Sequence, residues 1–242
     1  MSITFFDISP ALGGNGWTPN TIKTRVSLNY KGIPFESEFI QFVDIEPLMK
    51  KNGGAPTAKK EDGRDHYTLP AIRNSATNEY ITESLRIAAY LDEKFPNKPP
   101  LIPTGTRAAI ELFVQVFEQK IKPVYAVMRH ASMMILDDAN KNFFETTRNV
   151  TAPPVGAARD AVWNTVKEGL DFTADLYDTN GANKPFYLGD TFSFADTVVI
   201  GYLMWVKIIL GADSDEWKLV ASWREGRWEK FLELTKKWQW QQ

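Results

Sequence analysis

Cysteine is absent from this sequence. Its absence excludes disulfide scaffolds, thiolate metal sites, CxxC redox chemistry and a cysteine nucleophile. Histidine occurs twice, as His66 and His130, which is too few to indicate a zinc site or a separate hydrolytic triad. We therefore expect no metal site.

The sequence also lacks an excess of either charge and a long hydrophobic run. Lys and Arg number 28 against 30 Asp and Glu, so no broad field favours nucleic acid or an anionic membrane. The longest apolar run, 197–210, carries Lys207 and is shorter than the ~20 residues that span a bilayer. The N-terminus has no basic segment followed by a long apolar core. We expect a cytoplasmic protein whose partner is a small molecule or another protein.

Strand and helix patterns alternate over the first 95 residues. An apolar run predicts a strand at 3–8, and a period-two pattern predicts another at 35–40. Between them, a helix begins after Thr18, with Pro19 in its first turn, and ends at Gly32. A loop over 50–66 follows, then the segments "YTLPAIR" and "EYIT", expected to form a hairpin, and the helical "ESLRIAAYLDEKF".

Beyond residue 95 the pattern changes. Residues 96–105 hold four prolines, and we place a linker there. Apolar residues then recur at helical spacing over 110–128, with a kink expected at Pro123, and over 155–177 from Val155 onward. Ser193 and Asp196 form a capping box before a buried helix. The sequence predicts an α/β domain over 1–95 and an all-α helical-bundle domain over 106–242.

The segment "GGNGWTPNTIKTR" permits a nucleotide-binding interpretation. Gly14 and Gly16 match the start of GxGxxG, and Glu36 lies where a ribose ligand is expected. However, Pro19 replaces the third glycine, and a hairpin follows instead of further parallel βαβ units. We reject a dinucleotide site on these grounds.

Two other segments provide groups that recognise an amino-acid backbone. In "TLPAI", a cis bond before Pro70 leaves the backbone of Leu69 unpaired and able to hold an extended peptide. In "TESLR", Glu83 and Ser84 stand at a helix start, where free amides attract a carboxylate and the Glu83 carboxylate attracts an ammonium. These groups fit a peptide with a free amino-acid head.

Thr18 presents a hydroxyl at the start of another helix, which is suited to stabilising a thiolate. Capping alone also explains a threonine at this position, with the Asn20 amide and nearby helix amides as alternative donors. A carboxylate, a peptide backbone and a thiolate together describe glutathione.

Further residues carry weaker indications. Lys59, Lys60 and Arg64 are cations that can meet the glycine carboxylate of glutathione, or simply belong to a solvated loop, and His66 can hydrogen-bond nearby. The tryptophans of the C-terminal half can form an aromatic wall for an aryl substrate, although core and interface packing is their ordinary role; they include Trp205, Trp217 and Trp223. On the long helix after the linker, Tyr125, Met128 and Arg129 can face the cleft beside the thiol.

Read together, "WTPNTIKTR", "TLPAI" and "ESLRIAAYLDE" resemble the glutathione-binding half of cytosolic glutathione transferases. The proline-rich linker and the capping box after "GDTFSFAD" extend the resemblance over nearly the whole chain. "TPNTIKTRVSLNYKG" is similar to the "SPNTWKTRxALNYKG" form of fungal etherase-like transferases, relatives of bacterial β-etherases that cleave lignin-type aryl ethers.

The resemblance implies a thioredoxin-like N-terminal domain and a homodimer that uses glutathione as co-substrate in detoxification. Leu69 then pairs with the cysteinyl unit, Pro70 is the cis proline, and Glu83 with Ser84 holds the γ-glutamyl unit. Thr18 stands where these relatives usually carry serine. The lack of cysteine argues against the thiol-transferase branch.

Three functions follow as hypotheses. The first is a transferase of the Ser/Thr hydroxyl type, whose glutathione thiolate attacks aromatic electrophiles by conjugation or ether cleavage. The second is a ligandin-like carrier that binds aryl compounds without turnover. The third is an assembly module that uses the fold for dimerisation.

Overall fold

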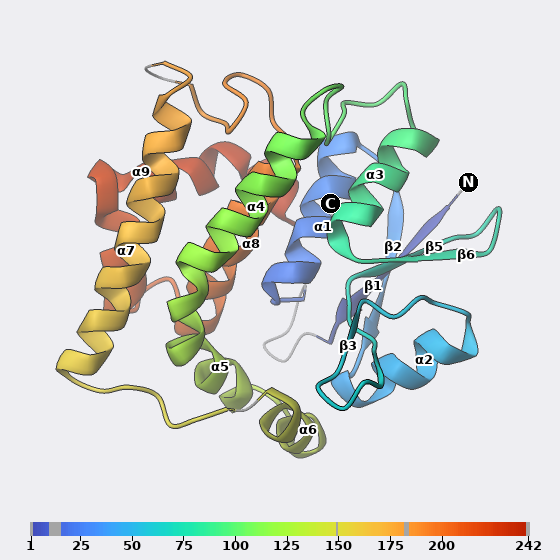
Figure 1. The fold of residues 1–242 in the computed structure, drawn as a ribbon, viewed down its shortest axis with the longest axis horizontal. Coiled ribbons are helices and arrows are strands. Elements are labelled where there is room, and N and C mark those ends of the chain that lie inside the picture. The colour runs from blue at the N-terminus through green and yellow to red at the C-terminus, as the bar shows by residue number, and fades with distance from the viewer. Residues whose placement is uncertain (1, 10–15, 149, 182–183, 241–242) are drawn as a thin grey trace.

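The computed structural model describes residues 2–9, 16–148, 150–181 and 184–240. Gly14, which entered the nucleotide-binding alternative, lies outside these residues. Figure 1 shows a mixed sheet with α1 and α3 on one side of the molecule and an array of longer helices on the other. Among the described residues, no helix is long and apolar enough to cross a membrane.

The sheet has the strand order β2-β1-β5-β6. Its strands are β1 (Ile3–Ile8), β2 (Phe35–Ile40), β5 (Ala71–Asn74) and β6 (Glu79–Thr82). β1 runs parallel to β2 and antiparallel to β5, with Phe5 opposite Ser37 on one side and Ile72 on the other. β5 and β6 form the expected antiparallel hairpin. This mixed sheet confirms the thioredoxin-like fold and argues against a doubly wound nucleotide-binding sheet.

Helix α1 (Pro19–Lys31) connects the two parallel strands, and its ends are those the sequence predicts. Thr18 is the N-cap, and Gly32 ends the helix in the left-handed conformation at φ 60°. Helix α3 (Ser84–Lys94) packs beside α1.

The segment between β2 and β5 was predicted less well. It contains a 3-10 turn η1 (Phe42–Asp44), the short helix α2 (Ile45–Lys51), and the strands β3 (Ala58–Lys59) and β4 (Asp65–His66). The prediction of a loop over 50–66 is therefore wrong where β3 pairs with β4. Strands of two residues carry no period-two pattern, which is why the sequence did not reveal them.

The C-terminal half is all helical, as expected. Its elements are α4 (Arg107–Ile121), η2 (Lys122–Val124), α5 (Tyr125–Met134), α6 (Asp138–Arg148), α7 (Ala157–Asp178), α8 (Phe194–Leu210) and α9 (Asp215–Gln239). Pro123 lies in η2 and separates α4 from α5, which confirms the predicted kink. Val155 lies before α7 and is 77% exposed, so its assignment to the buried helix face is wrong.

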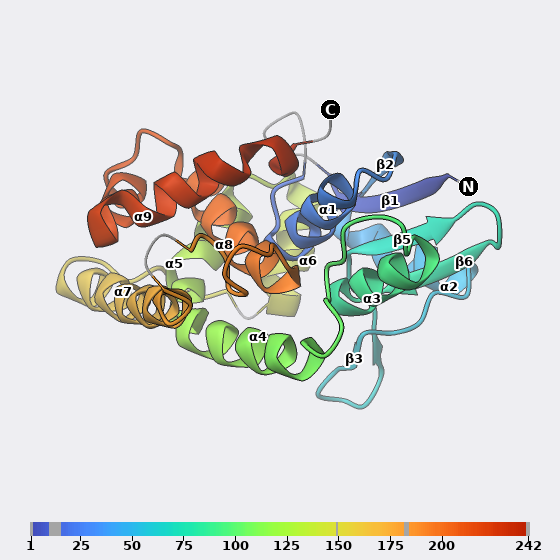
Figure 2. The ribbon, with the colours of Figure 1, turned by 90° about the horizontal axis from the view of Figure 1, so that it is seen from above.

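Helix α8 lies between α9 and α4 (Figure 2) and is buried over most of its length. The predicted capping box is present, and the Asp196 carboxylate also accepts the Tyr177 hydroxyl at 2.9 Å. Burial raises the pKa of Asp196 to about 6. α8 also crosses α1 closely: a Cβ at Gly201 would lie 2.6 Å from the Pro19 carbonyl oxygen. Glycine at 201 therefore allows the first turn of α1 to pack against the helical half.

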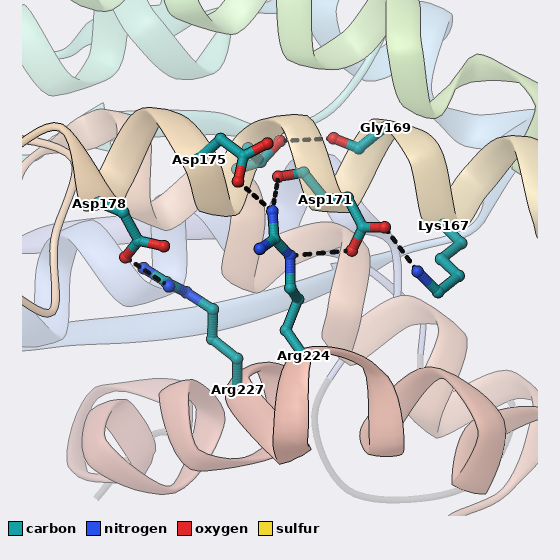
Figure 3. A network of polar contacts seen from close by, with 8 residues as sticks. Lys167, Gly169, Asp171, Asp175, Asp178, Arg224 and Arg227 are labelled. Atoms are coloured by element: carbon teal, nitrogen blue, oxygen red, sulfur yellow. Dashed lines mark hydrogen bonds and ion pairs between the residues drawn. The ribbon is translucent and has the colours of Figure 1, made fainter.

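Helices α7 and α9 are joined by a polar network (Figure 3). Arg224 donates to the carboxylates of Asp171 and Asp175, and Arg227 donates to Asp178 at 2.7 Å. The backbone of α9 is interrupted there, since Arg224 and Glu225 have φ of 51° and 57°. The two arginines thus hold a left-handed segment of α9 against α7.

Candidate functional site

Two cavities meet beside the start of α1. The first, here called the polar cavity, has a volume of about 230 Å³ and is lined by Asn20, Lys23, Thr68, Leu69, Pro70, Glu83, Ser84, Leu85, Val114, Glu118 and Phe194. The second, the apolar pocket, has about 130 Å³ and is lined by Ile8, Trp17, Thr18, Pro19, Asn20, Phe42, Ile45, Leu69, Tyr125, Arg129, Ser132, Phe144, Arg148 and Trp205. Asn20 and Leu69 line both. The structure thus brings six of the predicted site residues to one pair of adjoining cavities.

Leu69 and Pro70 lie directly before β5, and the peptide bond between them is cis, as the sequence predicted. Within the described part of the chain, no hydrogen bond satisfies the backbone N–H or C=O of Leu69. Both groups are therefore available to an extended peptide in the polar cavity.

Glu83 is the N-cap of α3, with φ 76°. Its carboxylate accepts hydrogen bonds from the amides of Leu85 at 3.0 Å and Arg86 at 3.1 Å, and from the Ser84 hydroxyl at 3.3 Å. The expectation of free amides at this helix start therefore needs correction, because Glu83 already accepts two of them. The carboxylate remains at the cavity wall, where a ligand ammonium can approach it.

Thr18 stands on the apolar side of the junction. Its hydroxyl oxygen accepts from the Thr21 amide at 3.3 Å and lies 2.8 Å from the Thr21 hydroxyl. The Thr18 hydroxyl can therefore cap α1 and still hold one proton to donate. The capping role is observed, and it is compatible with donation to a ligand sulfur.

Asn20 is connected through Lys23 to Glu118, two residues that the sequence did not single out. The buried Lys23 ammonium donates to Asn20 Oδ1 at 3.0 Å and to Glu118 Oε1 at 2.7 Å. Because Glu118 belongs to α4, this chain of contacts connects the first turn of α1 to the helical half. A lysine on an apolar helix face is the signal that could have identified Lys23.

Lys59 and His66 do not line the polar cavity. They border a separate groove of about 860 Å³, which shares Phe42, Ile45 and Arg148 with the apolar pocket. The Lys59 ammonium is paired with Asp65 at 2.6 Å. Burial lowers the pKa of His66, and the charge of Arg148 lowers it further.

The apolar pocket has an aromatic wall from both halves of the chain. Trp17 packs against Phe42, and Phe42 against Phe144 of α6, with ring centroids 6.3 and 5.4 Å apart. On the other side, Trp205 Nε1 donates to Ser132 at 2.9 Å, which fixes the indole. Tyr125 completes this side, and its hydroxyl lies 2.9 Å from that of Tyr202.

The structure supports some of the residues predicted to line the substrate pocket and not others. Tyr125, Arg129 and Trp205 line the pocket. Met128, Trp217 and Trp223 are buried but do not line it, because they pack inside the helical core. Among the described residues, no group of three or more acidic or histidine side chains could hold a metal ion.

Both halves of the chain match known families. Residues 17–94 match the family described as glutathione S-transferase, N-terminal domain, and residues 108–238 match the glutathione S-transferase, C-terminal domain. A curated relative, the glutathione S-transferase-like protein ustS of Aspergillus flavus, is 28% identical over 97% of this chain and 90% of its own length.

Solved structures of fungal proteins are similar over nearly the entire chain. A glutathione S-transferase of Ceriporiopsis subvermispora, in complex with glutathione, has a TM-score of 0.93 and 35% identity, covering 99% of this chain and 98% of its own. Glutathione transferase GSTFuA3 of Phanerochaete chrysosporium has a TM-score of 0.91 and 31% identity, covering 100% and 99%. This chain belongs to the glutathione S-transferase family.

Proposed function

We propose that this chain binds glutathione in the polar cavity and activates it as a thiolate beside Thr18, for attack on an aromatic electrophile in the apolar pocket. The observation that carries the proposal is the junction of the two cavities at Asn20 and Leu69, directly beside the Thr18 hydroxyl. In this arrangement the γ-glutamyl unit meets Glu83 and Ser84, and the cysteinyl backbone meets Leu69.

Thiolate formation needs a moderate stabilisation. Lowering a thiol pKa by two units requires about 2.7 kcal/mol at ~1.36 kcal/mol per unit. A charge-assisted hydrogen bond contributes about 1.5–3 kcal/mol, and a helix N-terminus contributes about 0.3–1 kcal/mol more. Thr18 and the start of α1 supply both, and the Asn20 amide nitrogen is a further donor. The thiol proton then passes to solvent without a protein base.

The reaction follows from the position of the thiolate. The sulfur forms a bond to an electrophilic carbon, and the electron pair leaves with the displaced group or moves onto a conjugated acceptor. For an aryl ether substrate the displaced group is a phenolate, as the likeness to etherase-type transferases suggests. Rate acceleration then comes from thiolate stabilisation and proximity. A cytoplasmic homodimer completes the proposal.

The contact between Thr18 and Thr21 favours a second candidate function. If the Thr18 hydroxyl donates to Thr21, its proton is not directed to the sulfur. The chain then acts as a ligandin-like carrier, which binds aryl compounds in the apolar pocket without consuming glutathione.

The test is the ultraviolet thiolate band of bound glutathione, titrated against pH for the wild type, Thr18→Val and Thr18→Ser. We expect a band below the free thiol's pKa in the wild type and in Thr18→Ser, but not in Thr18→Val. Thr18→Val also removes a helix cap, so Ser214→Ala, which removes the N-cap of α9, is the matched control. Glutathione binding without any shifted band in the wild type would establish the carrier.

A further inference from the structure

The described residues that line the apolar pocket carry two positive charges and no negative one. The guanidinium groups of Arg129, from α5, and Arg148, at the end of α6, line it beside the aromatic wall. Among the described residues that line the pocket, none is Asp or Glu. Positive charge in a largely aromatic cavity is costly unless an anion accompanies it.

Neither guanidinium has a carboxylate partner elsewhere in the described part of the chain. Arg129 stacks over the Tyr125 ring, with 5.1 Å from its central carbon to the ring centroid. Arg148 makes no hydrogen bond or ion pair with the described residues. Burial lowers the pKa of Arg148, and the positive charge of Arg129 lowers it further. The two like charges therefore act on each other across the pocket.

The position of Arg148 depends on contacts between the two halves. Asn140, at the start of α6, accepts the Phe42 amide at 2.8 Å, and Phe144 packs on Phe42 one turn before Arg148. α6 is thereby docked on η1, and Arg148 lies at the pocket wall. These contacts fix the end of α6, and with it Arg148, against the N-terminal half.

The surrounding groups indicate the form of the missing anion. Aromatic rings from Trp17, Phe42 and Trp205 suit a planar ring, and the volume of about 130 Å³ favours a single ring. Guanidinium groups pair best with planar carboxylates, through two parallel hydrogen bonds. We propose that the apolar pocket selects aromatic carboxylates, with Arg129 and Arg148 binding the carboxylate while the ring packs on the aromatic wall. That such a ligand is the electrophile rests on the function proposed above.

The glycine carboxylate of glutathione is an alternative ligand for Arg148. Arg148 also lines the groove that holds Lys59 and His66, so the glycine carboxylate of glutathione is its alternative partner. The two cases differ in which ligand loses affinity when Arg148 is replaced.

The test uses two single-ring compounds of nearly equal size, 4-chloro-3-nitrobenzoate and 4-chloro-3-nitrobenzamide. Their binding is measured by calorimetry on the full chain without glutathione, so that no reaction occurs. The variants are Arg129→Gln, Arg148→Gln and Arg148→Lys. Arg107→Gln on α4 is the control, since it removes the same charge from an exposed residue paired with Glu111. Thermal unfolding of each variant verifies that the fold is intact, and the glutathione affinity of each variant is measured separately.

We expect the wild type and Arg107→Gln to bind the benzoate at least about tenfold more tightly than the benzamide, which corresponds to ~1.4 kcal/mol. Each glutamine variant should weaken benzoate binding by about tenfold and leave benzamide binding within about twofold. Arg148→Lys should retain part of the preference. Equal affinities for the two compounds, or no measurable benzoate binding at millimolar concentration, would overturn the proposal. Loss of glutathione affinity in Arg148→Gln, without loss of benzoate affinity, would also overturn it.

A second measurement separates this inference from the proposed transferase function. With glutathione present, the thiolate displaces chloride from carbon 4 of either compound, and kcat/KM is divided by the uncatalysed rate constant for that compound. A binding preference without any turnover supports the anion site and contradicts the transferase function. Turnover without a binding preference supports the transferase function and contradicts the anion site.

Discussion

The hydroxyl oxygens of Thr18 and Thr21 lie 2.8 Å apart, one turn of α1 from each other. A single proton occupies this contact, and either oxygen can donate it. The direction of donation decides whether the Thr18 proton is available to a ligand sulfur at the start of the helix.

Thr21→Val removes the acceptor that competes with the sulfur and keeps the side-chain shape. We therefore expect the thiol pKa of bound glutathione to decrease in this variant, whereas Thr18→Val increases it. The thiolate band at fixed glutathione saturation measures both. An increase in Thr21→Val as large as that in Thr18→Val would mean that Thr21 polarises the Thr18 hydroxyl instead.

Lys23 and Glu118 connect the two halves of the chain at the polar cavity. Replacing Lys23 by Met leaves Glu118 and Asn20 without their shared donor. We expect Lys23→Met to lower the free energy of unfolding by about 1–2 kcal/mol, since Glu118 is partly exposed and can be hydrated. A urea double-mutant cycle with Glu118→Gln should give a coupling of ~1 kcal/mol. A coupling near zero would show that the pair does not bind the halves together.

Asp196 should make stability depend on pH. Its pKa is about 6 in the folded chain against 3.8 for the free side chain, so the folded state holds the proton more tightly. As pH rises from about 4 to 6, the unfolded state loses this proton first and the free energy of unfolding decreases, by ~3 kcal/mol for about two units. Urea unfolding of wild type and Asp196→Asn at pH 4 and pH 7 measures the contribution. The asparagine variant should lack this decrease, and equal pH dependence in both proteins would contradict the assignment.

The left-handed segment of α9 predicts a stabilising substitution. Glu225 has φ 57°, which costs a residue with a Cβ about 1–2 kcal/mol, while glycine adds about 0.5–1 kcal/mol of unfolded-state entropy. We expect Glu225→Gly to raise the free energy of unfolding by up to ~1 kcal/mol. Arg224→Gly is the matched control: it relieves a similar conformation but loses contacts to Asp171 and Asp175 (Figure 3). Thermal unfolding of both should rank Glu225→Gly above Arg224→Gly.

Local signals account for the parts of the fold that the sequence predicted well. The ends of α1 follow from Thr18 and Gly32, and the capping box from Ser193 and Asp196, because each signal acts within a few residues of itself. The interruption of the helix at Pro123 is likewise a local signal, because proline itself breaks the helical hydrogen bonding. Of the site residues, Thr18 is positioned by such a local signal, as the N-cap of α1.

The other residues of the site depend on contacts between distant segments. Helix α6 was not predicted: of its described residues, only Asn140 and Phe144 are buried, and Asn140 meets Phe42 across 98 positions of sequence. Arg148 reaches the pocket through that contact. Met128 lies within a turn of Tyr125 and Arg129, yet it faces the core, and the sequence pattern alone did not distinguish these faces.

The absence of a side chain at Gly201 restricts which substitutions the chain can tolerate. The carbonyl of Pro19 occupies the space that a methyl group would need, 2.6 Å from its position. The residues of the aromatic wall can be replaced one at a time without disturbing this contact between α1 and α8. Any residue larger than glycine at 201 would instead push the first turn of α1 away from the helical half. Directed evolution of this chain toward new ligands should therefore leave position 201 unchanged while Tyr125, Phe144 and Trp205 vary.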